Sequence, residues 1–276
     1  MPKLSVLMAI YQGDRPDWLE ECLQSLESQT RPADQIIVVH DGPVSQELMD
    51  VLERFRTRLA LESIALPRNV GLGAALRTGL EHCSHELVAR MDADDICVPH
   101  RFEKQLSYFE ENPDIDIVGA WIGEFDPASA QRIYALRRVP ELHAEIVRFA
   151  HRRNPFNHMT VMFKRTAIER AGSYRAVRGL EDYDLWARLL RSSAKAANIA
   201  EPLVWARAGD SLATRRGGLG YLFREYMLIH SFYASGFIGK SDLVITLTSR
   251  TFVRLVPAPL RTIAYRGIRL FGSFPR

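Results

Sequence analysis

The stretch Leu87-Val88-Ala89-Arg90-Met91-Asp92-Ala93-Asp94-Asp95 joins a short apolar run to three carboxylates. The apolar run predicts a buried strand, so the acids should lie where that strand ends. Asp92 and Asp94 are two residues apart, and in an extended chain such residues point to the same side. Crowded carboxylates repel one another, and a hard divalent cation with oxygen ligands relieves that repulsion. The pattern therefore indicates a metal site or, as the structural alternative, an acidic turn before a helix.

Segments of strand and helix character alternate on both sides of this stretch. The expected strands are Leu4–Ile10, Gln35–His40, Leu61–Leu66, Glu86–Met91 and Ile115–Trp121. Apolar residues at helical spacing predict helices between them at Asp17–Gln29, Gln46–Arg58, Leu72–Cys83 and His100–Asn112. This order predicts the α/β class, with a single Rossmann-like, doubly wound and mostly parallel sheet.

Three residues stand where predicted strands end, namely Tyr11, Asp41 and Asp92. In doubly wound sheets, ligands bind beyond the carboxyl ends of the strands. We therefore expect a pocket at this rim of the sheet.

The second half of the chain is less regular. Short strands are expected at Ile133–Leu136 and Thr160–Phe163, and helices at Leu142–Ala150, Arg165–Ala171 and Glu181–Arg191. The segment 208–220 is rich in Gly, Ser and Arg, which predicts a mobile loop.

Composition bounds the class of protein. The chain has 276 residues, of which 47% are hydrophobic and 25% are charged, as is ordinary for one large α/β domain with a small appendage. The three cysteines lack metal-ligand spacing, which predicts free thiols in a reducing compartment. We expect no signal peptide, because the apolar N-terminal strand runs into polar residues without a cleavage site. No run of about 18 apolar residues occurs, so no spanning helix is expected.

Five stretches, taken in order, resemble family 2 glycosyltransferases with the A-type nucleotide-sugar fold. They are Ser5–Gln12, Ile36–Gly42, Arg68–Gly73, Met91–Asp95 and Gly179–Trp186. Each stretch alone has little specificity, whereas their order and spacing between residues 4 and 215 are specific. Phe156–Thr160 and Trp205–Arg207 further resemble the branch that builds bacterial exopolysaccharides and the outer sugars of lipopolysaccharides, with amylovoran-type glycosyltransferases as the nearest likeness.

The resemblance implies a site for a nucleoside-diphosphate sugar. Asp41 would accept a hydrogen bond from the edge of the nucleobase, and Tyr11 would cover the base, with Ala9 in the same binding segment. The structural alternatives are a turn at Asp41-Gly42-Pro43 and packing of Tyr11 at a strand end.

Arginines are expected at the nucleotide and its diphosphate. Arg68 precedes Gly71 and Gly73, which permit close backbone approach, and could reach the nucleotide. Arg207 stands beside the glycine-rich loop that carries Arg215-Arg216, and such a loop could close over a diphosphate.

The two acidic segments divide the chemistry in the family pattern. Asp92 contacts the ribose or nearby sugar, and Asp94 binds Mn²⁺ or Mg²⁺, which stabilises the charge of the leaving diphosphate. Asp182 would be the general base that takes a proton from the acceptor hydroxyl, with Glu181 as its orienting neighbour. An exchange of these two roles stays open, and the structural alternative is an acidic pair that favours the helix dipole. One displacement inverts the anomeric centre.

The chain departs from the family pattern in one respect. Many members have Arg-x-His where this chain has Arg207-Ala208-Gly209, which puts a third protein ligand of the metal in doubt. The chain also lacks the Gln-x-x-Arg-Trp signature of processive synthases, so one sugar per acceptor is expected. We expect a UDP-linked donor and a saccharide acceptor of a bacterial surface polysaccharide. The alternative is a catalytically inactive relative that binds nucleotide as an assembly subunit.

The end of the chain is basic. Residues 203–276 hold 11 Lys/Arg and 3 Asp/Glu. We divide the chain into a glycosyltransferase domain, 1–215, and a helical basic extension, 216–276, whose arginines include Arg250, Arg254, Arg261, Arg266 and Arg269. A basic amphipathic segment can lie in a membrane interface, which would suit a lipid-linked acceptor and a cytoplasmic protein held at the inner face of the membrane. The alternative is a solvated appendage that packs on the body; no nucleic-acid partner is expected.

Overall fold

The predicted strands of the first half form a parallel sheet. β1 (Leu4–Ile10) lies between β2 (Gln35–His40) and β4 (Leu87–Arg90), and β3 (Leu61–Ala65) pairs with the far side of β2. All these pairings are parallel, so the carboxyl ends of the four strands meet at one edge. The structure, a computed structural model, describes residues 2–126, 133–207 and 219–255.

The second half extends the same sheet. β8 (Met162–Lys164) runs antiparallel between β4 and β6 (Ile117–Phe125), and β9 (Ala196–Arg207) runs parallel to β6. Two short strands, β5 (Ile96–Cys97) and β7 (Ile133–Arg137), pair antiparallel with β9 and β6. The order is β3-β2-β1-β4-β8-β6-β9-β5, with β7 beside β6. The expected mostly parallel α/β sheet is confirmed.

The long strand β9 was not predicted. Pro202 stands inside it, and proline argues against a strand interior because it cannot donate to the ladder. The structure accommodates Pro202 at an irregularity, since the register with β6 shifts on both sides of Trp121.

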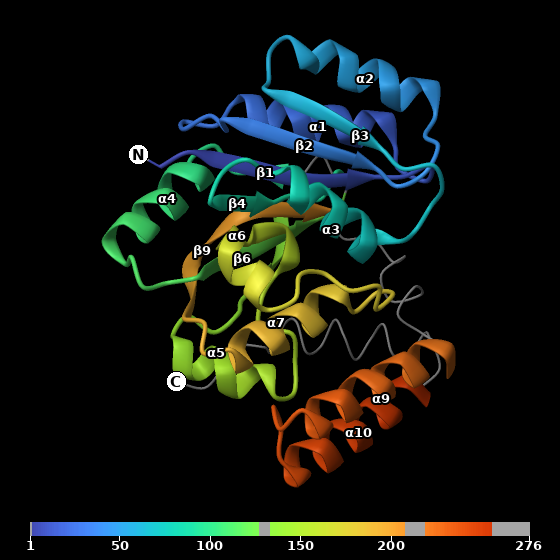
Figure 1. Cartoon of the computed structure of the whole chain (residues 1–276), viewed down its shortest axis with the longest axis vertical. Helices are drawn as coiled ribbons and strands as arrows, with labels where there is room; N and C mark the ends of the chain where they lie inside the picture. The colour runs from blue at the N-terminus through green and yellow to red at the C-terminus, as the bar shows by residue number, and fades with distance from the viewer. Residues whose placement is uncertain (1, 127–132, 208–218, 256–276) are drawn as a thin grey trace.

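Helices cover both faces of the sheet (Figure 1). They are α1 (Pro16–Glu27), α2 (Gln46–Arg56), α3 (Leu72–His82), α4 (Arg101–Glu111), α5 (His143–Ala150), α6 (Arg165–Arg170), α7 (Glu181–Arg191), α9 (Leu219–Ala234) and α10 (Lys240–Leu255). Side chains alternate along β1, so Val6 and Met8 join the core under α1, α2 and α4, while Leu7 joins the core under α3 and α7.

The last two helices form a hairpin beside α7 (Figure 1). Leu228 and Phe232 of α9 belong to the same apolar core as α7. The helix begins at Leu219, so the last two residues of the predicted loop are helical, and residues 208–218, with Arg215 and Arg216, lie outside the described part.

One arginine of the basic extension faces inward, against our expectation. Arg250 forms an ion pair with the buried Glu225, and its Nη2 donates to the carbonyl oxygen of Arg152 at 3.0 Å. Arg250 therefore joins α10 to α9 and to the end of α5 instead of facing a membrane. The side chain of Arg254 and residues 261, 266 and 269 are outside the described residues.

None of the helices that the structure describes combines the length and apolar character needed to span a bilayer.

Candidate active site

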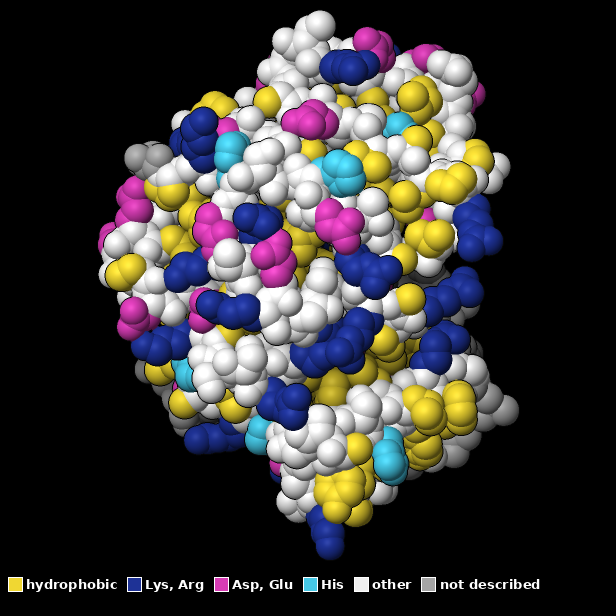
Figure 2. All heavy atoms as spheres, viewed as in Figure 1, with side chains coloured by type: hydrophobic (Ala, Val, Ile, Leu, Met, Phe, Trp, Pro, Cys, Tyr) yellow, Lys and Arg dark blue, Asp and Glu magenta, His cyan; other side chains and the backbone are white. Residues whose placement is uncertain are grey.

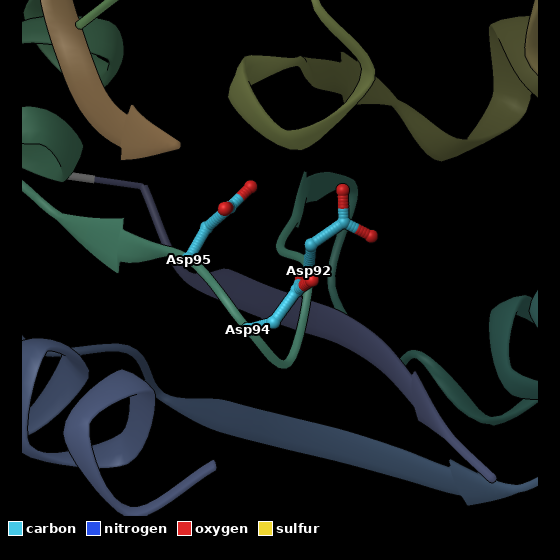
Figure 3. A group of neighbouring side chains, drawn as sticks. All are labelled: Asp92, Asp94 and Asp95. Atoms are coloured by element: carbon cyan, nitrogen blue, oxygen red, sulfur yellow. The ribbon is translucent and has the colours of Figure 1, made fainter. Parts of the chain in front are cut away.

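The acidic loop after β4 brings three carboxylates together. Each of Asp92, Asp94 and Asp95 offers an oxygen, and these oxygens lie within 4.8 Å of one another. In Figure 3 the carboxylates of Asp92 and Asp95 point to the same side of the loop, and Asp94 lies in the turn between them. Carboxylate oxygens are the hard donors that Mg²⁺ and Mn²⁺ prefer, so the donor set fits such an ion.

Asp95 is the most buried of the three acids. Its Oδ1 accepts a hydrogen bond from the backbone N–H of Arg207 at 2.9 Å. Burial raises the pKa of Asp95 well above its ordinary value, and the charges of Asp94 and Asp92 raise it further. A divalent cation would offset both effects, so the loop is electrostatically prepared for one. Asp95 was expected to start a helix, with direct contact to the ligand as the alternative, and it instead precedes the short strand β5.

Arg90 forms an ion pair with Asp92, the first of the three acids. Its side chain is fully buried at the end of β4, and its Nη1 forms an ion pair with Asp92. Arg90 stands only two residues before Asp92 in the chain, but the sequence could not show that its side chain turns toward Asp92. The pair fixes the carboxylate of Asp92 at the rim of the sheet.

A fourth carboxylate, which was not predicted from the sequence, lies near the acidic loop. Asp14 follows β1, and its Oδ2 accepts a hydrogen bond from the backbone N–H of Tyr11 at 2.9 Å. Burial raises the pKa of Asp14 to about 6, with smaller contributions from the charges of Asp94 and Asp92. A carboxylate directly after the first parallel strand was the available signal.

Asp41 braces the loop that leads into α3. Its two carboxylate oxygens accept hydrogen bonds from the backbone N–H groups of Val70 and Gly71, at 2.6 and 3.0 Å. The adjacent Gly42 has a φ of +88°, and a Cβ there would lie 2.6 Å from the backbone nitrogen of Asn69. The turn is therefore built for close approach of two loops, and the contact of Asp41 with a nucleobase remains a prediction.

The other predicted donor residues lie along the same edge. Tyr11 is exposed after β1, with its ring beside Gly13, and Ala9 is half-buried near the end of that strand. Arg68 is exposed in the loop that Asp41 braces. Their contacts with a nucleotide remain predictions.

Arg207, at the end of β9, contacts the acidic loop. Its Nε donates to the carbonyl oxygen of Asp94 at 2.5 Å, and its Nη2 forms an ion pair with Glu21. The guanidinium also lies over the rings of Trp18 and Phe125, 5.2 and 5.1 Å from their centroids. These contacts make Arg207 a brace of the loop, and a diphosphate contact by Arg207 remains a prediction.

The second acidic pair begins α7, as predicted. Glu181 is buried, and burial followed by the charge of Asp182 raises its pKa. Asp182 is half-buried, and its Oδ2 accepts a hydrogen bond from Nδ2 of Asn154 at 2.5 Å. Asn154 was not singled out from sequence, because its loop carries no motif.

Tyr174 is a fully buried residue in the segment that precedes α7. Burial raises its pKa, Arg90 opposes that rise, and the charges of Asp182, Glu181 and Asp92 add to it. Both acidic segments are therefore within electrostatic range of one hydroxyl group. Nε2 of His158 is 3.0 Å from the same hydroxyl, and burial with the charge of Arg90 lowers the pKa of His158 well below its ordinary value. His158 is thus a neutral structural partner of Tyr174.

A glycine lets α3 approach the start of α7. A Cβ at Gly73 would overlap the carbonyl oxygen of Arg175 and lie 3.0 Å from Cβ of Glu181. The start of α3, which directly follows the loop braced by Asp41, therefore lies against Glu181.

Residues 5–172 match the family described as glycosyl transferase family 2. The chain belongs to this family. The amylovoran biosynthesis glycosyltransferase AmsE of Erwinia amylovora is 42% identical over 96% of this chain and 98% of that protein. An Escherichia coli UDP-Gal:α-D-GlcNAc-diphosphoundecaprenol β-1,3-galactosyltransferase is 38% identical over 97% of this chain and 96% of its own length.

Family 2 membership makes the chain a glycosyltransferase, and it confirms the resemblance and the amylovoran-type likeness seen in the sequence. The fold agrees with that of a solved glycosyltransferase. The mannosyltransferase PcManGT from Pyrobaculum calidifontis, in complex with GDP-Man and Mn²⁺, superposes with a TM-score of 0.59 at 16% identity, over 99% of this chain and 88% of that one. The A-type glycosyltransferase fold is thereby confirmed.

Proposed function

We propose that this family 2 glycosyltransferase is an inverting, metal-dependent enzyme that transfers one sugar from a UDP-linked donor to a saccharide acceptor. One observation supports this above all. The oxygens of Asp92, Asp94 and Asp95 gather within 4.8 Å at the carboxyl edge of a parallel sheet, where ligands of such sheets bind. A nucleoside diphosphate needs a cation at such a place, because the acids alone would repel it.

The acids of the β4 loop would hold Mn²⁺ or Mg²⁺, with Asp94 as the principal ligand. The bound ion would neutralise the charge that develops on the leaving nucleoside diphosphate. Arg90 keeps Asp92 in place beside the ion, and Arg207 keeps the backbone of Asp94 in place. Both arginines act as positioning residues.

A residue at the start of α7 would remove the proton of the acceptor hydroxyl. Asp182 would accept the proton of the acceptor hydroxyl as that oxygen attacks the anomeric carbon from the side opposite the diphosphate. The hydrogen bond from Asn154 orients one carboxylate oxygen of Asp182. Since one displacement completes the transfer, the anomeric configuration inverts.

The relatives support the class of donor and acceptor. The Escherichia coli relative is named for UDP-Gal and for a saccharide linked to diphosphoundecaprenol, and the Erwinia amylovora relative for amylovoran biosynthesis. We therefore place the reaction in bacterial surface polysaccharide synthesis, with a lipid-linked acceptor. A lipid-linked acceptor would place the enzyme in the cytoplasm, peripheral on the inner face of the membrane.

Titration of the purified protein with UDP, with Mn²⁺ and with chelator, tests the metal site. We expect Mn²⁺ to tighten UDP binding, and Asp94→Asn to remove at least about tenfold of that gain, equivalent to about 1.4 kcal/mol. Asp50→Asn, at an exposed carboxylate on α2, is the matched control and should bind like the parent.

Two results would count against the proposal. UDP affinity that does not respond to Mn²⁺ or chelator would remove the metal site. Metal-dependent UDP binding without sugar transfer to any lipid-linked saccharide would instead favour the nucleotide-binding assembly subunit.

A further inference from the structure

Two adjoining cavities lie where α6, α7 and α9 meet, away from the acidic loop. Their volumes are about 190 and 240 Å³, and both are lined by Arg175, Arg188 and Arg191. Arg170 lines one of them, and Asp184 lines the other. The lining of the two cavities thus includes four arginines and one carboxylate. The function proposed above uses none of these residues.

The charge of Asp184 does not neutralise the positive charge of the arginines that line the cavities. Oδ2 of Asp184 accepts hydrogen bonds from Nε and Nη2 of Arg188, at 3.0 and 2.7 Å, so its charge is used by one arginine. Arg170 forms an ion pair outside the cavity lining, at 3.6 Å from Asp116. Within the described parts of the chain, the guanidinium of Arg175 has no ion-pair or hydrogen-bond partner. Arg175 is thus the cation available to a ligand.

The arginines also repel one another. Burial lowers the pKa of Arg188, the ion pair with Asp184 opposes that change, and the charge of Arg175 lowers the pKa further. An anion in the cavity would relieve this repulsion. Phosphate groups suit arginine clusters because guanidinium groups donate paired hydrogen bonds to their oxygens.

An exposed apolar stripe leads to the cavity. Phe223 and Met227 of α9 are 64% and 59% exposed. Ser231 and Ser235 follow at the same four-residue spacing, and both line the cavity with Arg175. Figure 2 shows basic side chains over α7 and hydrophobic side chains over the α9–α10 hairpin, on one face of the molecule. A phosphate beside acyl chains matches this combination.

We propose that the arginine cavity binds the phosphate of an anionic membrane lipid, while Phe223 and Met227 enter the adjoining apolar layer. This inference rests on the membrane location in the proposed function. It moves the main membrane contact from the basic end of the chain to the α7–α9 junction.

Co-sedimentation of the full chain with vesicles tests the proposal. We expect binding to phosphatidylglycerol vesicles and little binding to phosphatidylcholine vesicles. Since each arginine near an anionic surface contributes about 1 kcal/mol, Arg175→Gln with Arg191→Gln should weaken binding roughly 30-fold. Arg56→Gln, at an exposed arginine of α2, is the matched control. Unchanged binding of the double variant overturns the proposal.

Further variants separate the sources of phosphate. Phe223→Ser with Met227→Ser should also weaken vesicle binding, and inorganic phosphate should compete only weakly. Two results together would overturn the lipid assignment in favour of a soluble phosphate compound. They are unchanged vesicle binding by the Phe223→Ser, Met227→Ser variant and strong competition by inorganic phosphate. The single variant Arg175→Gln loses no described hydrogen bond or ion pair and relieves the repulsion of Arg188, so it should be at least as stable to heat as the parent.

Failure of this inference is distinguishable from failure of the proposed function. Metal-dependent UDP binding is measured without vesicles, and vesicle binding is measured without UDP. Each result therefore stands without the other.

Discussion

Glu181 and Asp182 are neighbours in sequence but differ in surroundings. Glu181 is buried against the glycine contact with α3, whereas Asp182 is half-buried and oriented by Asn154. A general base must reach the acceptor hydroxyl, and the more accessible Asp182 suits that task. The elevated pKa of Glu181 suits a carboxyl group that orients its neighbour or the acceptor.

The base assignment predicts different effects of two isosteric changes. Asp182→Asn should lower kcat by about 10²–10⁴ and leave the Kd for the donor nearly unchanged, because only the proton acceptor is removed. Glu181→Gln should have the smaller effect on kcat. Steady-state kinetics with titration of UDP would measure both quantities. Full activity of Asp182→Asn with loss in Glu181→Gln would exchange the two roles.

Asp14 predicts a pH-dependent stability. Its pKa in the folded protein is about 6, against an ordinary value of 3.8. Between these values the folded state binds more protons than the unfolded state, so stability falls as the pH rises through this window. Above pH 6 the cost is complete. Two pKa units correspond to about 3 kcal/mol, which solvent screening of a partly exposed group reduces to roughly 1–2 kcal/mol.

Asp14→Asn should therefore be more stable than the parent at pH 7 by that amount and equal to it near pH 3.5. Urea unfolding across this range, with chelator present, measures the difference in unfolding free energy. Saturating Mn²⁺ should shrink the gain, because a cation near Asp14 favours its charged form. A difference that is the same at all pH values would refute the assignment.

At the scale of elements, sequence was most informative where each strand and helix is built from local residues. β1, β2 and α7 have the predicted bounds, since apolar periodicity alone specifies them. β9 escaped prediction because its pairing with β6 absorbs a proline at an irregular register. The ends of the predicted strands indicated the edge of the sheet at which the candidate site lies. Burial of Arg90 and the position of Asp14 depend on contacts between distant segments, which one sequence does not display.

The contact between α3 and α7 makes Gly73 sensitive to substitution. Gly73→Ala would push a methyl group into the carbonyl oxygen of Arg175, and such overpacking costs about 1–3 kcal/mol. Turnover should fall as well, because the displaced segment carries Glu181. Chemical unfolding with kinetics measures both effects.

Gly220→Ala is the matched control for Gly73→Ala. A Cβ there would have its nearest neighbour at 4.0 Å, so alanine at this position should not destabilise the protein. Equal responses of the two variants would contradict the close contact at Gly73.

At the scale of the whole molecule, the C-terminal hairpin is joined to the catalytic body. The Tyr183 ring packs edge-on against Phe232 of α9, 5.0 Å between centroids, and Asp242 of α10 pairs with Arg152 at 2.8 Å. The boundary predicted after residue 215 therefore separates segments that share one core, although it remains a prediction for folding units.

The ion pair of the buried Glu225 with the partly exposed Arg250 predicts a double-mutant result. Arg250→Met removes the guanidinium group that pairs with Glu225, which should cost about 3–5 kcal/mol. Adding Glu225→Leu should recover most of that loss, because matched apolar residues replace such pairs well. Urea unfolding of the four proteins of the cycle measures the coupling. Additive losses would show that the pair does not hold the hairpin.

The hydrogen bond from the backbone N–H of Arg207 to Asp95 has a consequence for the chain during its synthesis. The two partners are 112 positions apart, so translation delivers all three acids of the loop long before the strand that anchors them. A nascent or prematurely terminated polypeptide ending ahead of β9 would carry the complete acidic signature without its support. Such fragments should be unable to react with the nucleotide sugar. Only chains that include β9 would then be active.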